Sequence, residues 1–282
     1  GEMGKGRGGH DVGREYGQLY SVAMATLKPV FNFFWRFRVE GLENVPSSGP
    51  AIMAPNHTSV LDSFFLPAVL PRRITYVGKA EYMDDWKTKH LFPALGMIPI
   101  DRGGGDAAER ALSAAQGVLE NGELFGIYPE GTRSRSGDLH RGHTGPARLA
   151  LRTGAPIVPV GLSGMVDIQP PDAKMPRPFR TAHIKIGKPI DVERYRDRAD
   201  DRLVLRQIID EVMFSIRDLS GQTYVDSYAT KKAEPVATPI AATAGTNGDG
   251  GQPPAEVVIE TEISAEDSSA SVLVMRPLEL AV

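Results

Sequence analysis

The sequence has 282 residues, of which 41% are hydrophobic and 24% are charged, a composition typical of a globular protein with a sizeable core. It contains no cysteine, which excludes disulfide bonds, thiolate metal ligands and cysteine nucleophiles. The net charge is −3, but residues 231–282 hold 3 basic and 8 acidic side chains, so the preceding chain carries +2. A weakly basic body suits an anionic membrane surface or substrate.

The N-terminal part divides into a flexible end and an aromatic segment. Residues 1–15 are rich in glycine and charge, so we expect them to be flexible. Residues 16–38 combine aromatic and basic side chains, which predicts an amphipathic helix that docks on a membrane and is kinked near Pro29. Lys28, Pro29 and Arg36 interrupt this segment, so it lacks the roughly 20 apolar residues of a spanning helix.

From residue 39 to 228, short apolar runs alternate with helical patterns. The predicted strands are 51–55, 74–78, 97–100, 124–129, 157–162 and 182–187. The predicted helices are 61–69, 82–92, 107–120, 147–152 and 202–219. Residues 229–282 lose this periodicity and form a low-complexity acidic tail. We therefore expect an α/β fold: a single mixed sheet flanked by helices, with an N-terminal interfacial helix and a disordered C-terminal tail.

A histidine five residues before an aspartate follows the predicted strand 51–55. On one continuous helix, the side chains of His57 and Asp62 would point about 140° apart and would not meet. They meet if His57 lies in the turn and Asp62 in the first helical turn, with Thr58 or Ser59 as the helix cap. Asp62 would then orient one imidazole nitrogen and leave the other free to accept a proton from a hydroxyl. The alternatives are a plain capping pair and a metal site, for which no third ligand lies nearby in sequence.

A charged turn, residues 128–134, ends the predicted strand 124–129. Its glycine, Gly131, exposes backbone N–H groups, and Arg133 beside it offers a planar fork of donors, so the turn suits a phosphate. The alternative is an ordinary surface turn in which Glu130 and Arg133 pair with each other.

Other basic residues follow predicted strands. Arg102 ends the strand 97–100 and is a candidate for the same anion as Arg133; the alternative is a solvated loop. The three glycines after it match no nucleotide-binding fingerprint. Lys79, Arg135 and Arg141 are further candidates for anion contacts, although such charges are usually only solvated.

Taken in order, four segments resemble the motifs of the glycerolipid acyltransferase family, which includes bacterial 1-acylglycerol-3-phosphate acyltransferase. They are Asn56-His57-x-x-x-x-Asp62, Gly96-x-Ile98-Pro99-Ile100-Asp101-Arg102, Tyr128-Pro129-Glu130-Gly131-Thr132-Arg133-Ser134 and Ala155-Pro156-Ile157-Val158-Pro159-Val160. The likeness spans about residues 39–187. It implies an acyltransferase domain over 39–228 that moves a fatty acyl group from acyl-CoA or an acyl-carrier-protein thioester to a lysophospholipid, forming phosphatidate in phospholipid biosynthesis without a cofactor or metal.

The resemblance also implies roles for individual residues. His57 would be the general base that deprotonates the acceptor hydroxyl, and Asp62 would orient it, so that the hydroxyl attacks the thioester directly. Arg133 would bind the acceptor phosphate with Arg102 as its partner, within an acceptor-binding set of Arg102, Glu130, Gly131, Thr132 and Arg133. The fourth segment would build either the acyl channel or an ordinary buried strand, and both readings stay open.

The acceptor and the attachment are the least determined features. Glycerol 3-phosphate, another lysophospholipid or a glycolipid are alternative acceptors, and a non-catalytic protein that binds anionic lipids is an alternative of a different class. We expect peripheral attachment to an anionic surface at the cytoplasmic face of the cell membrane, through residues 16–38. No nucleic-acid partner is expected, and the sequence does not determine the oligomeric state.

Overall fold

The computed structural model describes residues 12–79, 96–100, 107–171, 173, 175–198 and 201–230, all within one unit, Gly1–Pro235. The expectations for residues 1–11, for the helix over 82–92 and for the tail beyond residue 230 fall outside the described residues.

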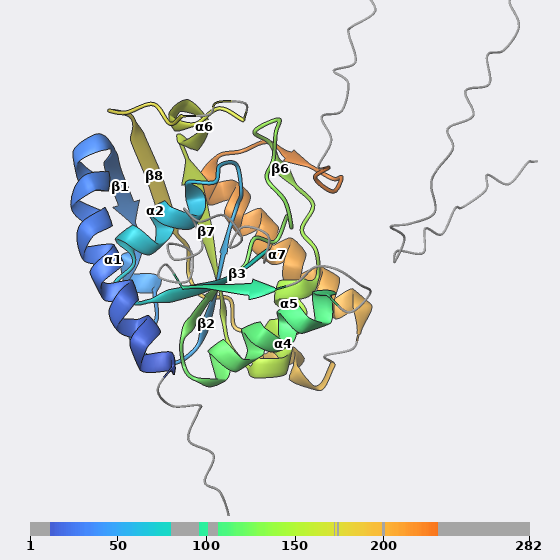
Figure 1. Cartoon of the computed structure of the whole chain (residues 1–282). Helices are drawn as coiled ribbons and strands as arrows, with labels where there is room; N and C mark the ends of the chain where they lie inside the picture. Colours follow the sequence, from blue (N-terminus) through green and yellow to red (C-terminus); the bar gives the residue numbers. More distant parts are fainter. Residues whose placement is uncertain are drawn as a thin grey trace, which may run out of the picture. The chain divides into compact units, whose positions relative to one another are not determined.

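A seven-stranded sheet runs through the described chain in the order β1-β8-β7-β2-β5-β3-β4 (Figure 1). Its strands are β1 (Arg36–Glu40), β2 (Ala51–Pro55), β3 (Ile74–Lys79), β4 (Met97–Ile100), β5 (Leu124–Gly126), β7 (Ile157–Ser163) and β8 (Thr181–Ile186). Neighbouring strands are parallel except β7 and β8, which are antiparallel, so the expected α/β fold with a mixed sheet is confirmed. Two short parallel strands, β6 (Leu139–His140) and β9 (Tyr224–Val225), form a second sheet.

Helices cover both faces of the large sheet (Figure 1). One core cluster joins it to α1 (Val12–Phe34), α2 (Asp62–Val69) and α6 (Met165–Ile168). The other cluster joins it to α4 (Ala107–Glu120), α5 (Gly145–Thr153) and α7 (Arg202–Ser220). Two short 3-10 helices, η1 (Leu42–Asn44) and η3 (Glu193–Arg198), lie in the connections. This three-layer arrangement buries the central strands on both faces, which explains why β2 is apolar at every position.

The predicted strand 124–129 is shorter than expected. The Ile127 N–H still donates to the Met53 carbonyl oxygen at 3.0 Å, but β5 itself ends at Gly126. Pro129 has no N–H to continue the ladder, so the chain leaves the sheet and forms the charged turn. The fourth motif segment lies in β7, whose residues Ile157 to Leu162 are buried between β2 and β8. It is therefore a core strand.

Strand β1 corrects the prediction that residues 16–38 form one helix. The helix ends at Phe34, and Arg36, Phe37 and Arg38 belong to β1, which pairs in parallel with β8. In β1, charged residues alternate with Phe37 and Val39, so the apolar side chains reach the core on one face only. In the sequence, the run of aromatic residues before β1 hid the short alternation of charged and apolar residues in that strand.

Helix α1 is attached to the sheet by aromatic side chains. Phe31 and Trp35 are buried and pack against Phe65, with ring centroids 5.4 and 5.2 Å from it. The indole N–H of Trp35 donates to the Arg177 carbonyl oxygen at 2.9 Å. Trp35 is therefore a core residue, not part of an exposed docking face. Within the described residues, no helix combines the length and apolar character needed to cross a membrane.

Candidate active site

The predicted pair of His57 and Asp62 forms at the carboxyl end of β2. His57 lies in the turn, Asp62 is the first residue of α2, and His57 Nδ1 is 3.0 Å from Asp62 Oδ2. The Asp62 side chain is 0% exposed, whereas that of His57 is 16% exposed. No hydrogen bond joins His57 Nε2 to another described residue, so this nitrogen is available to a substrate.

The turn between them is not held by the predicted helix cap, because Asp62 is the residue that accepts the hydrogen bonds. Instead of Thr58 or Ser59 capping the helix, Asp62 Oδ2 accepts hydrogen bonds from the backbone N–H groups of Thr58 at 2.8 Å and Ser59 at 2.9 Å. The helix cap position is Leu61, and its N–H donates to Ser59 Oγ at 3.1 Å. One carboxylate oxygen thus fixes both the loop and the imidazole.

Asn56 anchors the start of this turn, a role that the sequence did not reveal. Its side chain is fully buried; Oδ1 accepts from the Leu162 N–H at 2.7 Å, and Nδ2 donates to the Leu162 carbonyl oxygen at 2.9 Å. Nδ2 also donates to Gln222 Oε1 at 2.7 Å. Asn56 therefore ties the end of β2 to β7 and to the chain after α7. Its position beside His57 was the only available signal.

Glu130 connects the charged turn to the histidine loop. Its side chain is fully buried, with Oε1 accepting from the His57 N–H at 3.0 Å and Oε2 from the His140 N–H at 2.9 Å. The Ser134 N–H donates to the His57 carbonyl oxygen at 2.7 Å. This arrangement excludes a surface pair with Arg133. Both carboxylate oxygens accept hydrogen bonds from backbone groups of the fold.

Tyr128 restrains the imidazole from its face. The two rings are stacked, with centroids 3.8 Å apart and planes inclined by 16°. The hydroxyl groups of Tyr128 and Ser63 are 2.7 Å apart and share a hydrogen bond. Tyr128 also stacks on Tyr76, with the two ring centroids 5.8 Å apart. Sequence reasoning placed Tyr128 in a motif without a role and missed Ser63 and Tyr76, because these contacts depend on the neighbouring positions of β2, β5 and β3.

Residues 131–133 of the charged turn are exposed or half-buried. Gly131 has a φ of 72°, and a Cβ there would lie 3.0 Å from the His143 ring, so only glycine fits without strain. Thr132 is half-buried and Arg133 is exposed; Arg133 forms no ion pair with a carboxylate of the described residues. Arg133 is thus free to meet an anion, whereas the Gly131 N–H already donates to the Tyr128 carbonyl oxygen at 3.0 Å.

Two of the other predicted anion contacts, Arg135 and Arg141, already interact within the protein. Arg141 Nη1 lies 3.7 Å from Asp226 Oδ1. The guanidinium carbon of Arg141 lies over the ring of Tyr228, 5.6 Å from the ring centroid. Arg135 is exposed and already interacts within the protein. Lys79 is the last residue of β3, and the described structure does not include its side chain. Arg102 lies outside the described residues. Among the described side chains, no group of three His, Asp or Glu is arranged to hold a metal ion.

The raised pKa of Glu130 makes stability depend on pH. Burial raises this pKa to about 7, although hydrogen bonds from the His140 and His57 N–H groups lower it. The folded chain therefore binds the proton more tightly, so this stabilisation is complete below pH 4.5, the ordinary pKa, and is lost as pH rises through about 7. The difference between the ordinary and the raised pKa corresponds to about 3 kcal/mol in the free energy of unfolding.

We expect Glu130→Gln to remove this dependence. Relative to that variant, the wild-type free energy of unfolding should fall by about 3 kcal/mol between pH 4.5 and 7.5, measured by urea unfolding. A difference between the two proteins that does not change with pH would contradict the raised pKa.

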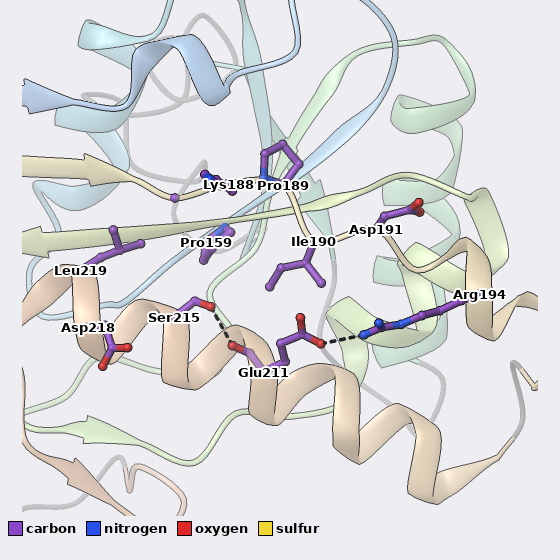
Figure 2. A pocket seen from close by; sticks show the side chains of 11 residues that line it. Pro159, Lys188, Pro189, Ile190, Asp191, Arg194, Glu211, Ser215, Asp218 and Leu219 are labelled. Carbon is purple, nitrogen blue, oxygen red and sulfur yellow. Dashed lines mark hydrogen bonds and ion pairs between the residues drawn. The ribbon is translucent and has the colours of Figure 1, made fainter.

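A pocket of about 610 Å³ lies beside α7 (Figure 2). It is lined by Pro159, Gly187, Lys188, Pro189, Ile190, Asp191, Arg194, Glu211, Ser215, Asp218 and Leu219. Arg194 and Glu211 form an ion pair of 3.3 Å across it. Because neither His57, Asp62 nor Glu130 lines it, the pocket is separate from the candidate active site.

Comparisons with known proteins match the region that builds the site. Residues 36–163 match the family model described as Acyltransferase. This segment begins with β1, ends with β7 and contains His57, Asp62 and the turn 128–134. This segment is therefore similar to the acyltransferase family. The family resemblance predicted from the four motif segments is confirmed.

Named relatives are similar to part of the chain. The chain is 30% identical over 158 residues to 1-acyl-sn-glycerol-3-phosphate acyltransferase LPAT1, chloroplastic, of Arabidopsis thaliana, which covers 56% of this chain and 44% of that protein. It is 30% identical over 124 residues to the 1-acyl-sn-glycerol-3-phosphate acyltransferase of Borreliella burgdorferi, covering 44% and 50%. The chain spans about half the length of these relatives.

A solved structure shares the fold of the acyltransferase domain. It is the crystal structure of the 1-acyl-sn-glycerophosphate (LPA) acyltransferase PlsC from Thermotoga maritima. The TM-score is 0.60 and the identity 24%, over 75% of this chain and 83% of that one. This likeness supports the layered α/β architecture independently of the motifs.

Proposed function

We propose that this protein transfers a fatty acyl group from acyl-CoA or an acyl-carrier-protein thioester to a hydroxyl of 1-acylglycerol 3-phosphate, forming phosphatidate. The names of the relatives support this reaction, and the family model matches the segment that holds the candidate site. The observation that carries the proposal is the contact of 3.0 Å between His57 Nδ1 and Asp62 Oδ2, which leaves His57 Nε2 available.

In the proposed reaction, His57 acts as the general base. Its Nδ1–H donates to Asp62, so Nε2 is unprotonated and takes the proton from the acceptor hydroxyl. The hydroxyl oxygen then attacks the thioester carbonyl carbon, the C–S bond breaks, and the thiolate takes the proton back from the imidazolium. Asp62 stabilises the positive charge that His57 carries between these steps. The acyl group passes directly to the acceptor, without a covalent enzyme intermediate.

Glu130 and Tyr128 are positioning residues in this mechanism. Glu130 accepts a hydrogen bond from the His57 N–H, and Tyr128, stacked on the imidazole, limits tilting of that ring. Neither needs to touch the substrate. Their value lies in keeping Nε2 at a fixed place, since a small misplacement of a reacting group lowers the rate strongly.

Arg133, which follows the turn at Gly131, binds the acceptor phosphate in this proposal. A charge-assisted hydrogen bond to phosphate contributes about 1.5–3 kcal/mol, so Arg133→Gln should raise the KM for 1-acylglycerol 3-phosphate roughly 10- to 100-fold. The value of kcat should change less, because the chemistry occurs at His57. Arg202→Gln, which removes another exposed arginine at the start of α7, is the matched control.

The experiment is an acceptor panel with one labelled acyl-CoA. It includes 1-acylglycerol 3-phosphate, glycerol 3-phosphate, a neutral lysophospholipid and a phosphate-free monoacylglycerol, with free-thiol release and product analysis as readouts. Equal activity with the phosphate-free alcohol would contradict the phosphate clamp. Lipid binding without thiol release would contradict catalysis and favour a lipid-binding protein.

Peripheral attachment to the cytoplasmic face of an anionic membrane is the second part of the proposal. On α1, Val22, Val30 and Phe33 are exposed along one face, opposite the buried Phe31. Residues 16–34 therefore keep the docking role expected for the segment, whereas Trp35 does not. The acyltransferase domain follows from β1 and ends before the acidic tail.

A further inference from the structure

The loop of residues 175–180 is joined to the end of α1, although about 140 residues separate them in sequence. The Phe179 N–H donates to the Phe34 carbonyl oxygen at 2.6 Å, and the Arg36 N–H donates to the Arg180 carbonyl oxygen at 3.0 Å. Figure 1 shows this end of α1 beside the start of β8. The loop also contains two prolines, which restrict its backbone. The two segments therefore behave as one unit.

Large apolar side chains of both segments face solvent. Phe33 is 71% exposed, Met175 is 78% exposed and Phe179 is 69% exposed. The ring of Phe34 connects the two phenylalanines, with its centroid 5.1 Å from that of Phe33 and 6.3 Å from that of Phe179. Isolated exposed apolar residues are ordinary, but a contiguous group of them marks an interaction surface.

Phe179 is kept in an unfavourable backbone conformation. Its φ is 59°, and among the described residues it is the only non-glycine residue with a positive φ. This left-handed conformation favours glycine or asparagine over a bulky residue. The strained backbone and the solvent-exposed phenyl ring each lower the stability of the free protein. The ring is therefore explained by a contact made outside the folded chain.

Three arginines lie within two residues of Phe34 or Phe179 along the chain. Arg36, Arg177 and Arg180 are exposed, and none forms an ion pair with a carboxylate of the described residues. Aromatic rings beside unpaired basic groups match the headgroup region of an anionic bilayer, where rings enter the acyl boundary and guanidinium groups meet phosphates.

We propose that the loop 175–180 is a second membrane anchor and that it forms, with the end of α1, one surface that binds an anionic phospholipid bilayer. This aromatic–arginine patch consists of Phe33, Phe34, Arg36, Met175, Arg177, Phe179 and Arg180. The choice of a membrane over an acidic protein rests on the proposed function, in which the acceptor is itself a bilayer lipid. Two anchors fix the orientation of the domain on the membrane, whereas one helix end would leave it free to rotate.

The test measures co-sedimentation of the full chain with vesicles of phosphatidylcholine, alone or mixed with phosphatidylglycerol. Phe179→Asn removes the ring and suits the left-handed backbone, so we expect the partition coefficient to fall roughly tenfold or more while the midpoint of thermal unfolding does not fall. The double variant Arg177→Gln/Arg180→Gln should lose roughly 10- to 30-fold on mixed vesicles and little on phosphatidylcholine alone. Phe214→Ser, which removes an exposed ring from α7, is the control and should bind as the wild type does.

Each outcome separates this inference from the proposed function. If Phe33→Ser lowers binding and Phe179→Asn does not, the second anchor is wrong and attachment through α1 stands. If the wild type binds neither vesicle, both membrane proposals fail, while acyl transfer to detergent-solubilised substrates still tests the chemistry. If Phe179→Asn changes self-association in sedimentation velocity but not vesicle binding, the patch is a protein interface and the inference is overturned.

Discussion

Replacing His57 with alanine is expected to lower acyl transfer by about 10²- to 10⁴-fold, the usual contribution of a positioned general base. The imidazole is the only described group that combines a buried carboxylate partner at 3.0 Å with a nitrogen open to substrate. Without it, the acceptor hydroxyl must lose its proton to water. The measurement is the initial rate of thiol release from acyl-CoA in the presence of 1-acylglycerol 3-phosphate.

The fold should survive this change. His57 contributes its backbone, not its ring, to the hydrogen bonds with Glu130 and Ser134, and alanine keeps that backbone. His183→Ala, a half-buried histidine in β8, is the control and should retain wild-type rates. A His57→Ala protein that is folded by circular dichroism and fully active would remove the basis of the proposed mechanism.

Replacing Asp62 with asparagine should have a comparable effect on the rate, by a different route. The amide oxygen can still accept from Thr58 and Ser59, but it carries no charge to stabilise the imidazolium of His57. A loss on the order of 10²- to 10⁴-fold is expected from such a change in a carboxylate–histidine pair. The KM for the acceptor should move little, because Asp62 is buried and touches no substrate.

Asp62→Ala should instead reduce stability. The N–H groups of Thr58 and Ser59 are buried and would lose their acceptor, at about 1–3 kcal/mol for each unsatisfied group. Urea unfolding of the two Asp62 variants separates these roles, and the ¹⁵N chemical shifts of His57 report its tautomer. If Asp62→Asn keeps the wild-type rate, Asp62 holds the loop and has no part in proton transfer.

Parallel strand order explains why the site residues meet. β2 pairs with β5, so the turn after β2 and the turn after β5 leave the sheet at the same edge. The first turn carries His57, and the second carries Tyr128 and Glu130. Three contacts then join them: the ring stack, the Glu130 hydrogen bond and the hydrogen bond from Ser134. A variant that shortens either turn would therefore displace the imidazole.

Local patterns in the sequence determined the strands β2 and β4, the helix α4 and the turn that lets His57 reach Asp62. These features depend on apolar periodicity and on residues a few positions apart, which are visible in the chain itself. The family motifs added the expectation that this turn and the turn at Glu130 belong to one site.

Only the tertiary structure decided which side chains face inward. Glu130 and Arg133 are three residues apart with similar apparent roles, yet Glu130 is buried on backbone N–H groups while Arg133 is exposed. Trp35 belongs to the core because Phe65 and the Arg177 carbonyl meet it from distant parts of the chain. Burial is set by the neighbours that the fold brings to a residue, and those neighbours are not encoded in its local pattern.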